Sequence, residues 1–410
     1  MSSSPNAPAR SSSPQTLARG ASERYDERSS VADDIARAMA LKRVMMMMHA
    51  RPEVSARGRR VHRSLTTTTP ASTTPATTTT TKSTSVDDDD DDDATFVPGF
   101  VPVVHHETYS AVTLPRGHRF PMGVFELIHQ TCANEGVVRA DGSNAYAPKR
   151  APTNEALERA HCATYVAAVR SSTLSAKAVR EIGLPWSDAL VRRTLMEVSG
   201  TMLTTRLALK RGLAVNTAGG THHANYDRGS GYCILNDLCT SAFDAIASGA
   251  VKKVMIVDLD VHQGDGTAGI VNATRRNSEV YTFSAHASSN FPARKEKSSR
   301  DVELARGLRD DEYLSIVSAA LRESIEEFQP QLIIYDAGVD VTENDTLGHL
   351  SLSVEGLYRR ERMVLDTALG AGIPLAGVVG GGYSPDLEEL ASRHCVLHRV
   401  AQEMFVDHGL

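Results

Sequence analysis

The chain has 410 residues, with 44 Lys and Arg against 50 Asp and Glu, a formal net charge of −6 and five Cys. This length has room for one large domain or two ordinary ones. The five Cys are scattered and form no Cys-x-x-Cys pair, so a disulfide-stabilised secreted scaffold is not expected. No apolar run approaches the ~20 residues of a membrane-spanning helix, and we expect a soluble intracellular protein without a membrane partner.

The charge is unevenly distributed along the chain. Residues 1–86 hold 13 Lys and Arg against 6 Asp and Glu, Asp87 to Asp93 are seven consecutive acids, and residues 94–410 hold 31 basic against 37 acidic side chains. The part expected to fold is therefore mildly acidic. Because nucleic-acid binding depends on the neutralisation of phosphates by Lys and Arg, we expect no direct nucleic-acid binding.

Residues 1–93 are predicted to be a disordered tail. They combine Ser, Pro, Ala and Arg, then 12 Thr within residues 66–84, and then the run of seven Asp. Such a composition buries too little apolar area to offset chain entropy. From Met45 onward the tail is rich in Ser, Thr and Arg and poor in acids, which is typical of an organelle transit peptide, but the residues before Met45 include five acids. A plastid or mitochondrion and the nucleus or cytoplasm both stay open as locations.

From about residue 96, short apolar runs alternate with helical periodicity. The expected strands cover residues 100–104, 213–216, 253–258, 279–284, 331–336 and 373–379. Most are almost continuously apolar, as strands buried on both faces of a parallel sheet are. Helices are expected from about 235 to 249 and over 312–328, where Gln329-Pro330 ends the second. The alternation predicts one large α/β domain, a doubly wound and mostly parallel sheet with helices on both faces, whose active site lies at the carboxyl ends of the strands.

The first group of polar residues follows the expected strand that ends at residue 258. Asp260 and His262 are two positions apart, so in extended backbone their side chains point to the same side. An oxygen and a nitrogen donor, completed by a third protein ligand, are typical of catalytic zinc. Asp340, which comes after the strand ending at residue 336, is the candidate third ligand.

Adjacent histidines follow another strand end. His222 and His223 come directly after Gly219-Gly220-Thr221. Two imidazoles near a metal can share the work of general base and general acid if carboxylates orient their ring nitrogens. Asp258 and Asp265 are the available carboxylates.

Three consecutive glycines, Gly380-Gly381-Gly382, follow the last expected strand and precede Tyr383. Consecutive glycines cost chain entropy, so they indicate a packing or functional requirement. A Tyr383 hydroxyl that projects into the site can donate a hydrogen bond to a developing oxyanion.

Together these four motifs resemble the zinc-dependent histone deacetylases of the arginase/deacetylase superfamily, over roughly residues 98–405. The resemblance implies a deacetylase-like catalytic domain that hydrolyses an acyl-amide, most simply an acyl-lysine of a protein. It implies that Zn²⁺ is bound by Asp260, His262 and Asp340. The catalytic residues that it implies are His222, His223, Asp258, Asp265 and Tyr383.

The resemblance also assigns roles to these residues. His223, oriented by Asp265, would be the general base and acid. His222, paired with Asp258, would be its electrostatic partner, and Tyr383 would polarise the carbonyl group. Gly231, Tyr232 and Phe291 would line a narrow tunnel for the acyl-lysine stem. A structural K⁺ would be held by Asp258, Asp260 and His262 with the segment near Ser284.

The subfamily signal lies in two stretches, His118 to Met122 and Asn290 to Glu296, which are similar to class IV deacetylases and their bacterial relatives. The chain departs from the family pattern in places. Val124 and Phe125 stand where a basic residue and a Tyr are expected, and Tyr232 stands where a Phe is common. We therefore expect a different entrance to the tunnel.

Other functions stay open. A two-manganese ureohydrolase shares the sheet and the Asp-x-His motif, but it needs a second carboxylate two residues after Asp340, where this chain has Thr342. A catalytically weak acyl-lysine-binding corepressor scaffold is an alternative from another class. Deacetylation of small acetylated amines such as polyamines is a third. Acyl-chain length and oligomeric state are not readable from the sequence.

Overall fold

Eight strands form one sheet in the part of the chain that the structure, a computed structural model, describes, residues 96–410. The expectations for residues 1–93 lie outside the described residues. The strands are β1 (Val103–Val104), β2 (Ala145–Tyr146), β3 (Leu213–Asn216), β4 (Val254–Asp258), β5 (Val280–Ala287), β6 (Arg300–Leu304), β7 (Leu332–Asp336) and β8 (Leu375–Val378). Their order is β2-β1-β3-β8-β7-β4-β5-β6, and every pairing within the sheet is parallel. The predicted parallel α/β sheet is confirmed.

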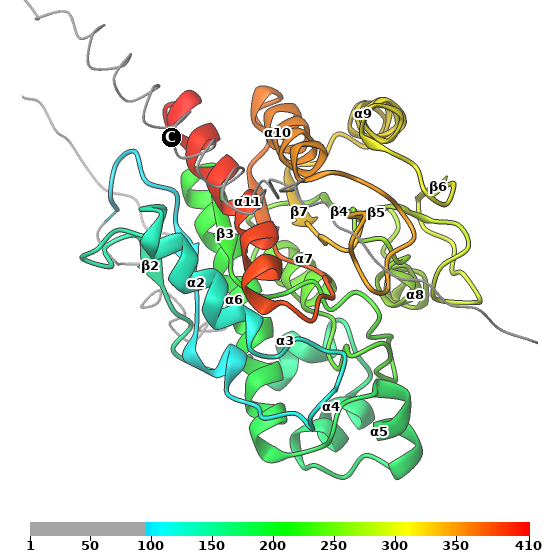
Figure 1. Cartoon of the computed structure of the whole chain (residues 1–410). Helices are drawn as coiled ribbons and strands as arrows, with labels where there is room; N and C mark the ends of the chain where they lie inside the picture. Colours follow the sequence, from blue (N-terminus) through cyan, green and yellow to red (C-terminus); the bar gives the residue numbers. More distant parts are fainter. Residues whose placement is uncertain (1–95) are drawn as a thin grey trace, which may run out of the picture. The chain divides into compact units, whose positions relative to one another are not determined.

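Helices cover both faces of this sheet (Figure 1). Within residues 96–410 they are the 3₁₀ turn η3 (Glu107–Ser110), α2 (Val124–Asn134), α3 (Asn154–Glu158), α4 (Ala163–Arg170), α5 (Ala176–Ile182), α6 (Asp188–Arg211), α7 (Asp237–Ala247), α8 (Asp265–Thr274), α9 (Asp310–Phe328), α10 (Val354–Gly370) and α11 (Leu387–Asp407). Helices α6, α7 and α8 pack on one face. Helices α2, α11, α10 and α9 pack on the other, with α2 and α11 side by side.

The alternation of side chains along β4 explains why both faces need cover. Val254 and Ile256 pack into the cluster formed with α7 and α8, whereas Met255 and Val257 pack into the cluster formed with α9 and α10. All five residues of β4 are buried. A strand apolar on both faces stays in water-free surroundings only between two layers of helices.

The six expected strands are all present, and the structure adds two that the sequence did not reveal. The additions, β2 and β6, form the two edges of the sheet. β2 has two residues, and β6 alternates between exposed and buried positions. Edge strands are short and half polar, so they lack the continuous apolar run that marks a central strand. Helix α9 begins at Asp310 instead of residue 312 and ends at Phe328 as predicted.

The register of the central strands gathers polar residues at one edge of the sheet. Asp258 at the end of β4 lies opposite Asp336 on β7 and Ser284 on β5. The loops that follow β3, β4, β7 and β8 therefore leave the sheet at the same edge, as in other parallel α/β sheets. Among the described residues, no helix combines the length and apolarity that a membrane span requires.

Candidate active site

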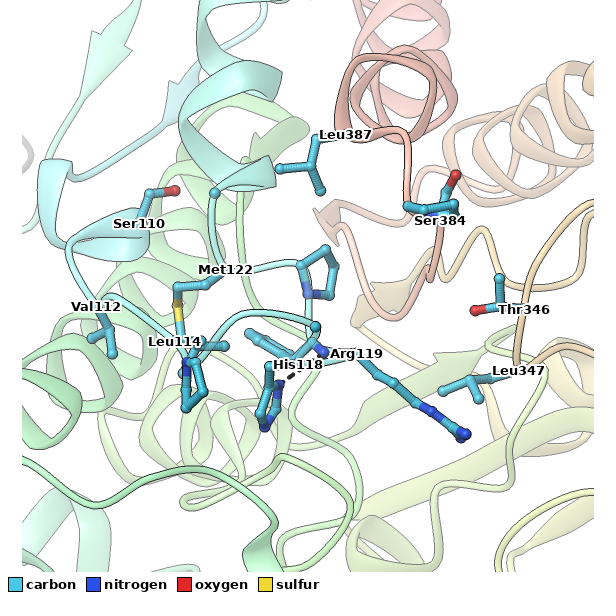
Figure 2. A pocket seen from close by; sticks show the side chains of 16 residues that line it. Ser110, Val112, Leu114, His118, Arg119, Met122, Thr346, Leu347, Ser384 and Leu387 are labelled. Carbon is cyan, nitrogen blue, oxygen red and sulfur yellow. Dashed lines mark hydrogen bonds between the residues drawn. The ribbon is translucent and has the colours of Figure 1, made fainter.

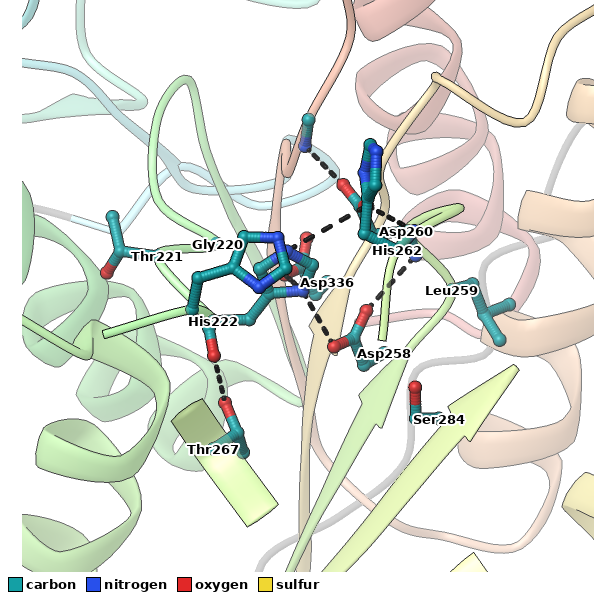
Figure 3. Close-up of polar contacts among 12 residues, drawn as sticks. Gly220, Thr221, His222, Asp258, Leu259, Asp260, His262, Thr267, Ser284 and Asp336 are labelled. Atoms are coloured by element: carbon teal, nitrogen blue, oxygen red, sulfur yellow. Dashed lines mark hydrogen bonds and ion pairs between the residues drawn. The ribbon is translucent and has the colours of Figure 1, made fainter. Parts of the chain in front are cut away.

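Asp260, His262 and Asp340 converge, although three strands and two helices separate the first pair from the last residue along the chain. One donor atom of each lies within 4.8 Å of the others. Nδ1 of His262 lies 2.9 Å from Oδ1 of Asp260 and 3.0 Å from Oδ2 of Asp340. All three side chains are buried, and Asp260 and His262 stand out in the close-up of Figure 3. The loops after β4 and β7 bring them together.

The three side chains fit a bound metal ion. Oδ1 of Asp340 accepts the backbone N–H of Val261 at 2.8 Å, whereas its buried Oδ2, 3.0 Å from Nδ1 of His262, makes no well-directed hydrogen bond to any described residue. Burial and the charge of Asp260 raise the pKa of Asp340 to about 7, which shows how poorly two carboxylates share this space without a cation. Two carboxylates and one imidazole are donors that zinc accepts.

Each adjacent histidine is paired with its own carboxylate. Nδ1 of His222 donates to Oδ2 of Asp258 at 2.8 Å, and Nδ1 of His223 donates to Oδ1 of Asp265 at 2.6 Å. The two imidazole rings lie 4.1 Å apart. With the proton held on Nδ1 by a carboxylate, Nε2 of a neutral ring in this position carries the lone pair that a general base needs.

The two histidines differ in their electrostatic surroundings. Burial, with a contribution from His222, lowers the pKa of His223 to about 4, so this imidazole is neutral and able to take up a proton. Burial acts against protonation of His222 as well. The carboxylates of Asp258, Asp260 and Asp336 outweigh it and raise the pKa of His222 well above its usual value.

The consecutive glycines let the backbone approach these carboxylates closely. The N–H of Gly381 donates to Oδ2 of Asp260 at 2.8 Å, and a methyl group on Gly381 would overlap that oxygen. A methyl group on Gly380 would overlap Oδ1 of Asp336. The packing requirement that the sequence indicated is therefore contact with buried acids.

Tyr383 is held at the site through its backbone. Its N–H donates to Oδ2 of Asp345 at 2.6 Å, and its carbonyl accepts the N–H of Thr346 at 3.0 Å. Its ring lies 6.3 Å from that of His262. Burial and the nearby carboxylates of the metal site raise the pKa of Tyr383 well above its usual value, so the hydroxyl stays protonated and can donate a hydrogen bond. Nothing in the sequence around Asp345 pointed to this positioning contact.

Two of the three predicted tunnel residues, Gly231 and Phe291, contact the ring of His223. Gly231 faces the ring, because a methyl group there would lie 2.6 Å from Cδ2 of His223, and its φ of +53° suits glycine. The Phe291 ring meets the His223 ring edge-on at 4.8 Å and is 43% exposed. The Tyr232 ring lies 6.2 Å from that of Tyr383. The tunnel itself stays a prediction.

An open depression of about 720 Å³ adjoins these residues (Figure 2). It is lined mainly by residues 110–123, with Thr346, Leu347, Ser384 and Leu387 from the loops around Tyr383. The His118 ring also contacts the ring of Tyr232. Val124 and Phe125 do not line the depression. They are buried at the start of α2, and the expectation that the tunnel has a different entrance stays a prediction.

Arg360, on α10, is a buried cation that the sequence analysis did not single out. It donates to the carbonyls of Leu259 at 3.1 Å, Gly338 at 2.8 Å and Ala337 at 3.2 Å. Glu361 accepts from it at 2.6 Å. Arg360 thus ties the segments that follow β4 and β7, which carry Asp260 and Asp340. Its sequence signal, Arg next to Glu in an otherwise amphipathic helix, is indistinguishable from a solvated charge pair.

The structure also places two acidic residues, Asp336 and Asp237, next to the segment that carries the histidines, and the sequence analysis gave them no role. Both carboxylate oxygens of Asp336 are buried without a hydrogen bond to any described residue, and Oδ2 lies 3.7 Å from Nδ1 of His222. Asp237 accepts the N–H groups of Gly220 at 3.0 Å and Thr221 at 2.8 Å, which fixes the turn before the histidines. Ser284, which lies opposite Asp258 (Figure 3), bonds to Nδ1 of His286 at 3.0 Å, and the potassium site expected near it stays a prediction.

Comparison with known proteins identifies the family. The histone deacetylase domain matches residues 118–398. An uncharacterized protein of Picosynechococcus sp. is 47% identical over 304 residues, which cover 74% of this chain and 99% of that protein. Histone deacetylase 2 of Arabidopsis thaliana is 36% identical over 194 residues, 46% of this chain and 48% of that protein. The chain therefore belongs to the histone deacetylase family.

A solved structure agrees on the fold. The crystal structure of the HDA15 HD domain matches with a TM-score of 0.60 and 20% identity, and covers 75% of this chain and 92% of that one. At this identity the likeness shows the fold alone. The match spans about half the length of the Arabidopsis relative.

Proposed function

We propose that this protein is a zinc-dependent amide hydrolase that removes an acyl group from a lysine side chain. Membership of the family indicates a hydrolase of the deacetylase type. The observation that carries the proposal is the convergence of Asp260, His262 and Asp340 beside two carboxylate-paired histidines, with a buried oxygen of Asp340 that has no well-directed hydrogen bond. A scaffold that only binds acyl-lysine has no need for this arrangement.

Zinc held by Asp260, His262 and Asp340 would supply Lewis acidity toward a water molecule and a substrate carbonyl. His223 takes the proton of the attacking water at Nε2 and returns it to the leaving amine, while Asp265 keeps the ring in the required tautomer. The negative charge of Asp258 stabilises the protonated form of His222. The Tyr383 hydroxyl donates a hydrogen bond to the carbonyl oxygen as negative charge builds there.

The test is a pair of substitutions with opposite expectations. Tyr383→Phe should keep a full complement of zinc and lose ~10²- to 10³-fold in kcat, because one oxyanion donor is gone. Asp260→Ala should lose zinc itself. Both are measured as metal content and as turnover of acyl-lysine peptides. Full activity of zinc-loaded Tyr383→Phe on every such peptide would remove Tyr383 from the mechanism.

Class IV character and a structural potassium ion have separate support. Class IV character rests on the His118 to Met122 and Asn290 to Glu296 stretches. A structural potassium near Asp258 and Ser284 rests on the family resemblance, and dependence of activity on K⁺ over Na⁺ would test it. Incubation with acetyl-lysine and myristoyl-lysine peptides and with acetylated polyamines separates a protein deacylase from an enzyme for small amines. Turnover of the polyamines alone would overturn the lysine assignment.

The ureohydrolase alternative lacks its second carboxylate. Thr342 occupies the required position, is buried, and its Oγ1 donates to the carbonyl of Val339 at 2.9 Å. Oγ1 of Thr342 also accepts from Arg393 at 3.1 Å. A neutral side chain in this role does not hold a second divalent ion. Metal analysis should therefore find no manganese pair.

A further inference from the structure

A second cluster of metal-binding side chain types lies between the end of β1 and helix α2. His105 directly follows β1, and Glu126 and His129 are three residues apart on α2, so they share one face of the helix. One donor atom of each lies within 4.8 Å of the others. The cluster shares no residue with the catalytic site.

The donor atoms are held by neighbouring groups. Nδ1 of His105 bonds to Oγ1 of Thr217 at 2.7 Å, which directs Nε2 toward Oε2 of Glu126, 3.2 Å away. The other oxygen of Glu126 accepts from Gln130 at 2.9 Å. The rings of His105 and His129 stack with centroids 4.1 Å apart. Such supporting contacts are typical of the residues around metal ligands.

The cluster is accessible from solvent on one side. The Glu126 side chain is 41% exposed, so an ion reaches the group directly from solvent.

We propose that His105, Glu126 and His129 form a second divalent-metal site, with zinc as the preferred ion and solvent completing its coordination. Two imidazoles and one carboxylate are a donor set that zinc accepts, whereas Ca²⁺ and Mg²⁺ prefer oxygen donors throughout. His105 and Glu126 already lie at the separation of two ligands on one ion. A donor atom of His129 lies within 4.8 Å of theirs and supplies the third ligand.

The experiment counts zinc on the purified full-length chain. The protein is stripped with a chelator, checked by circular dichroism, dialysed against micromolar free Zn²⁺ and analysed for bound metal. The wild type should hold about two ions per chain, one at each donor set. His129→Gln and Asp260→Ala should each hold about one, and the double variant none. His408→Gln, which changes a histidine at the far end of α11, is the matched control and should hold two.

Glu126→Gln guards against a folding artefact, because the amide keeps the size of the side chain and removes only its charge. It should weaken the second zinc at least ~10-fold. Equal zinc content in wild type, His129→Gln and Glu126→Gln would overturn the second site. The Asp260→Ala arm reports separately on the catalytic metal, so failure of one site is distinguishable from failure of the other.

Discussion

At the scale of single residues, the candidate active site depends on close approach between the backbone and the buried carboxylates. Oδ2 of Asp260 accepts the N–H of Gly381, and Gly338 packs against the same side chain. These contacts orient the carboxylate before any ion arrives. Preorganisation of this kind keeps the cost of assembling ligands out of the binding step.

Gly381→Ala tests this orientation. The added methyl group overlaps Oδ2 of Asp260, so the carboxylate must turn away, and we expect zinc affinity to fall ~10- to 100-fold. Competition with a chromophoric chelator measures the affinity. Gly370→Ala is the matched control, because a methyl group at Gly370 meets nothing within 4 Å. Unchanged zinc affinity in Gly381→Ala would show that the contact does not position Asp260.

At the scale of elements, the site depends on the relative positions of the segments that follow β4 and β7, and helix α10 holds these segments together. Arg360 and Glu361 are both fully buried, and Glu361 also accepts the hydroxyl of Tyr335 on β7 at 2.6 Å. The pair is thus fully hydrogen-bonded, which is the condition under which buried charges are tolerated. The helix thereby connects the segments after β4 and β7 to the packing of the sheet.

Arg360→Met should lower the free energy of unfolding by about 3 to 5 kcal/mol, because it leaves Glu361 buried without its partner and three carbonyls without donors. Urea denaturation measures this. Arg359→Met removes the neighbouring arginine, whose pair with Asp311 is 45% and 88% exposed, and should cost less than about 1 kcal/mol. Similar costs for both variants would mean that the buried network carries no special stability.

At the scale of the whole molecule, buried neutral histidines link stability to pH. Nδ1 of His161 donates to the carbonyl of Asn225 at 2.9 Å, and Nε2 accepts the N–H of Asn236 at 2.9 Å. The second contact requires the neutral ring, because a protonated Nε2 cannot accept a hydrogen bond. Burial lowers the pKa of His161 to about 4. The contribution is therefore complete above pH 6.5 and is lost as the pH falls from 6.5 toward 4.

Comparison of wild type with His161→Gln should reveal this loss. Between pH 7 and pH 5 the wild type should lose about 2 kcal/mol more than the variant, since glutamine does not titrate. Thermal or urea unfolding at both pH values provides the measurement. A variant with the same pH dependence as the wild type would show that His161 is not protonated on unfolding.

Much of the architecture follows from local pattern. Continuous apolar runs such as the one ending at Asp258 announce strands buried on both faces, and Gln329-Pro330 ends α9 where expected. The edge strands β2 and β6 escape this logic, because a half-polar strand is recognised only by the neighbour with which it pairs.

The sequence by itself determined the fold class and the motifs at the strand ends, because periodicity and the chemistry of donor side chains are local properties. Only the tertiary structure decided that Asp260, His262 and Asp340 meet, that Asp345 holds the Tyr383 backbone, and that Arg360 spans β4 and β7. Contacts between distant segments depend on strand order and register. Neither strand order nor register can be predicted from a short stretch of residues, since both arise from the packing of the whole sheet.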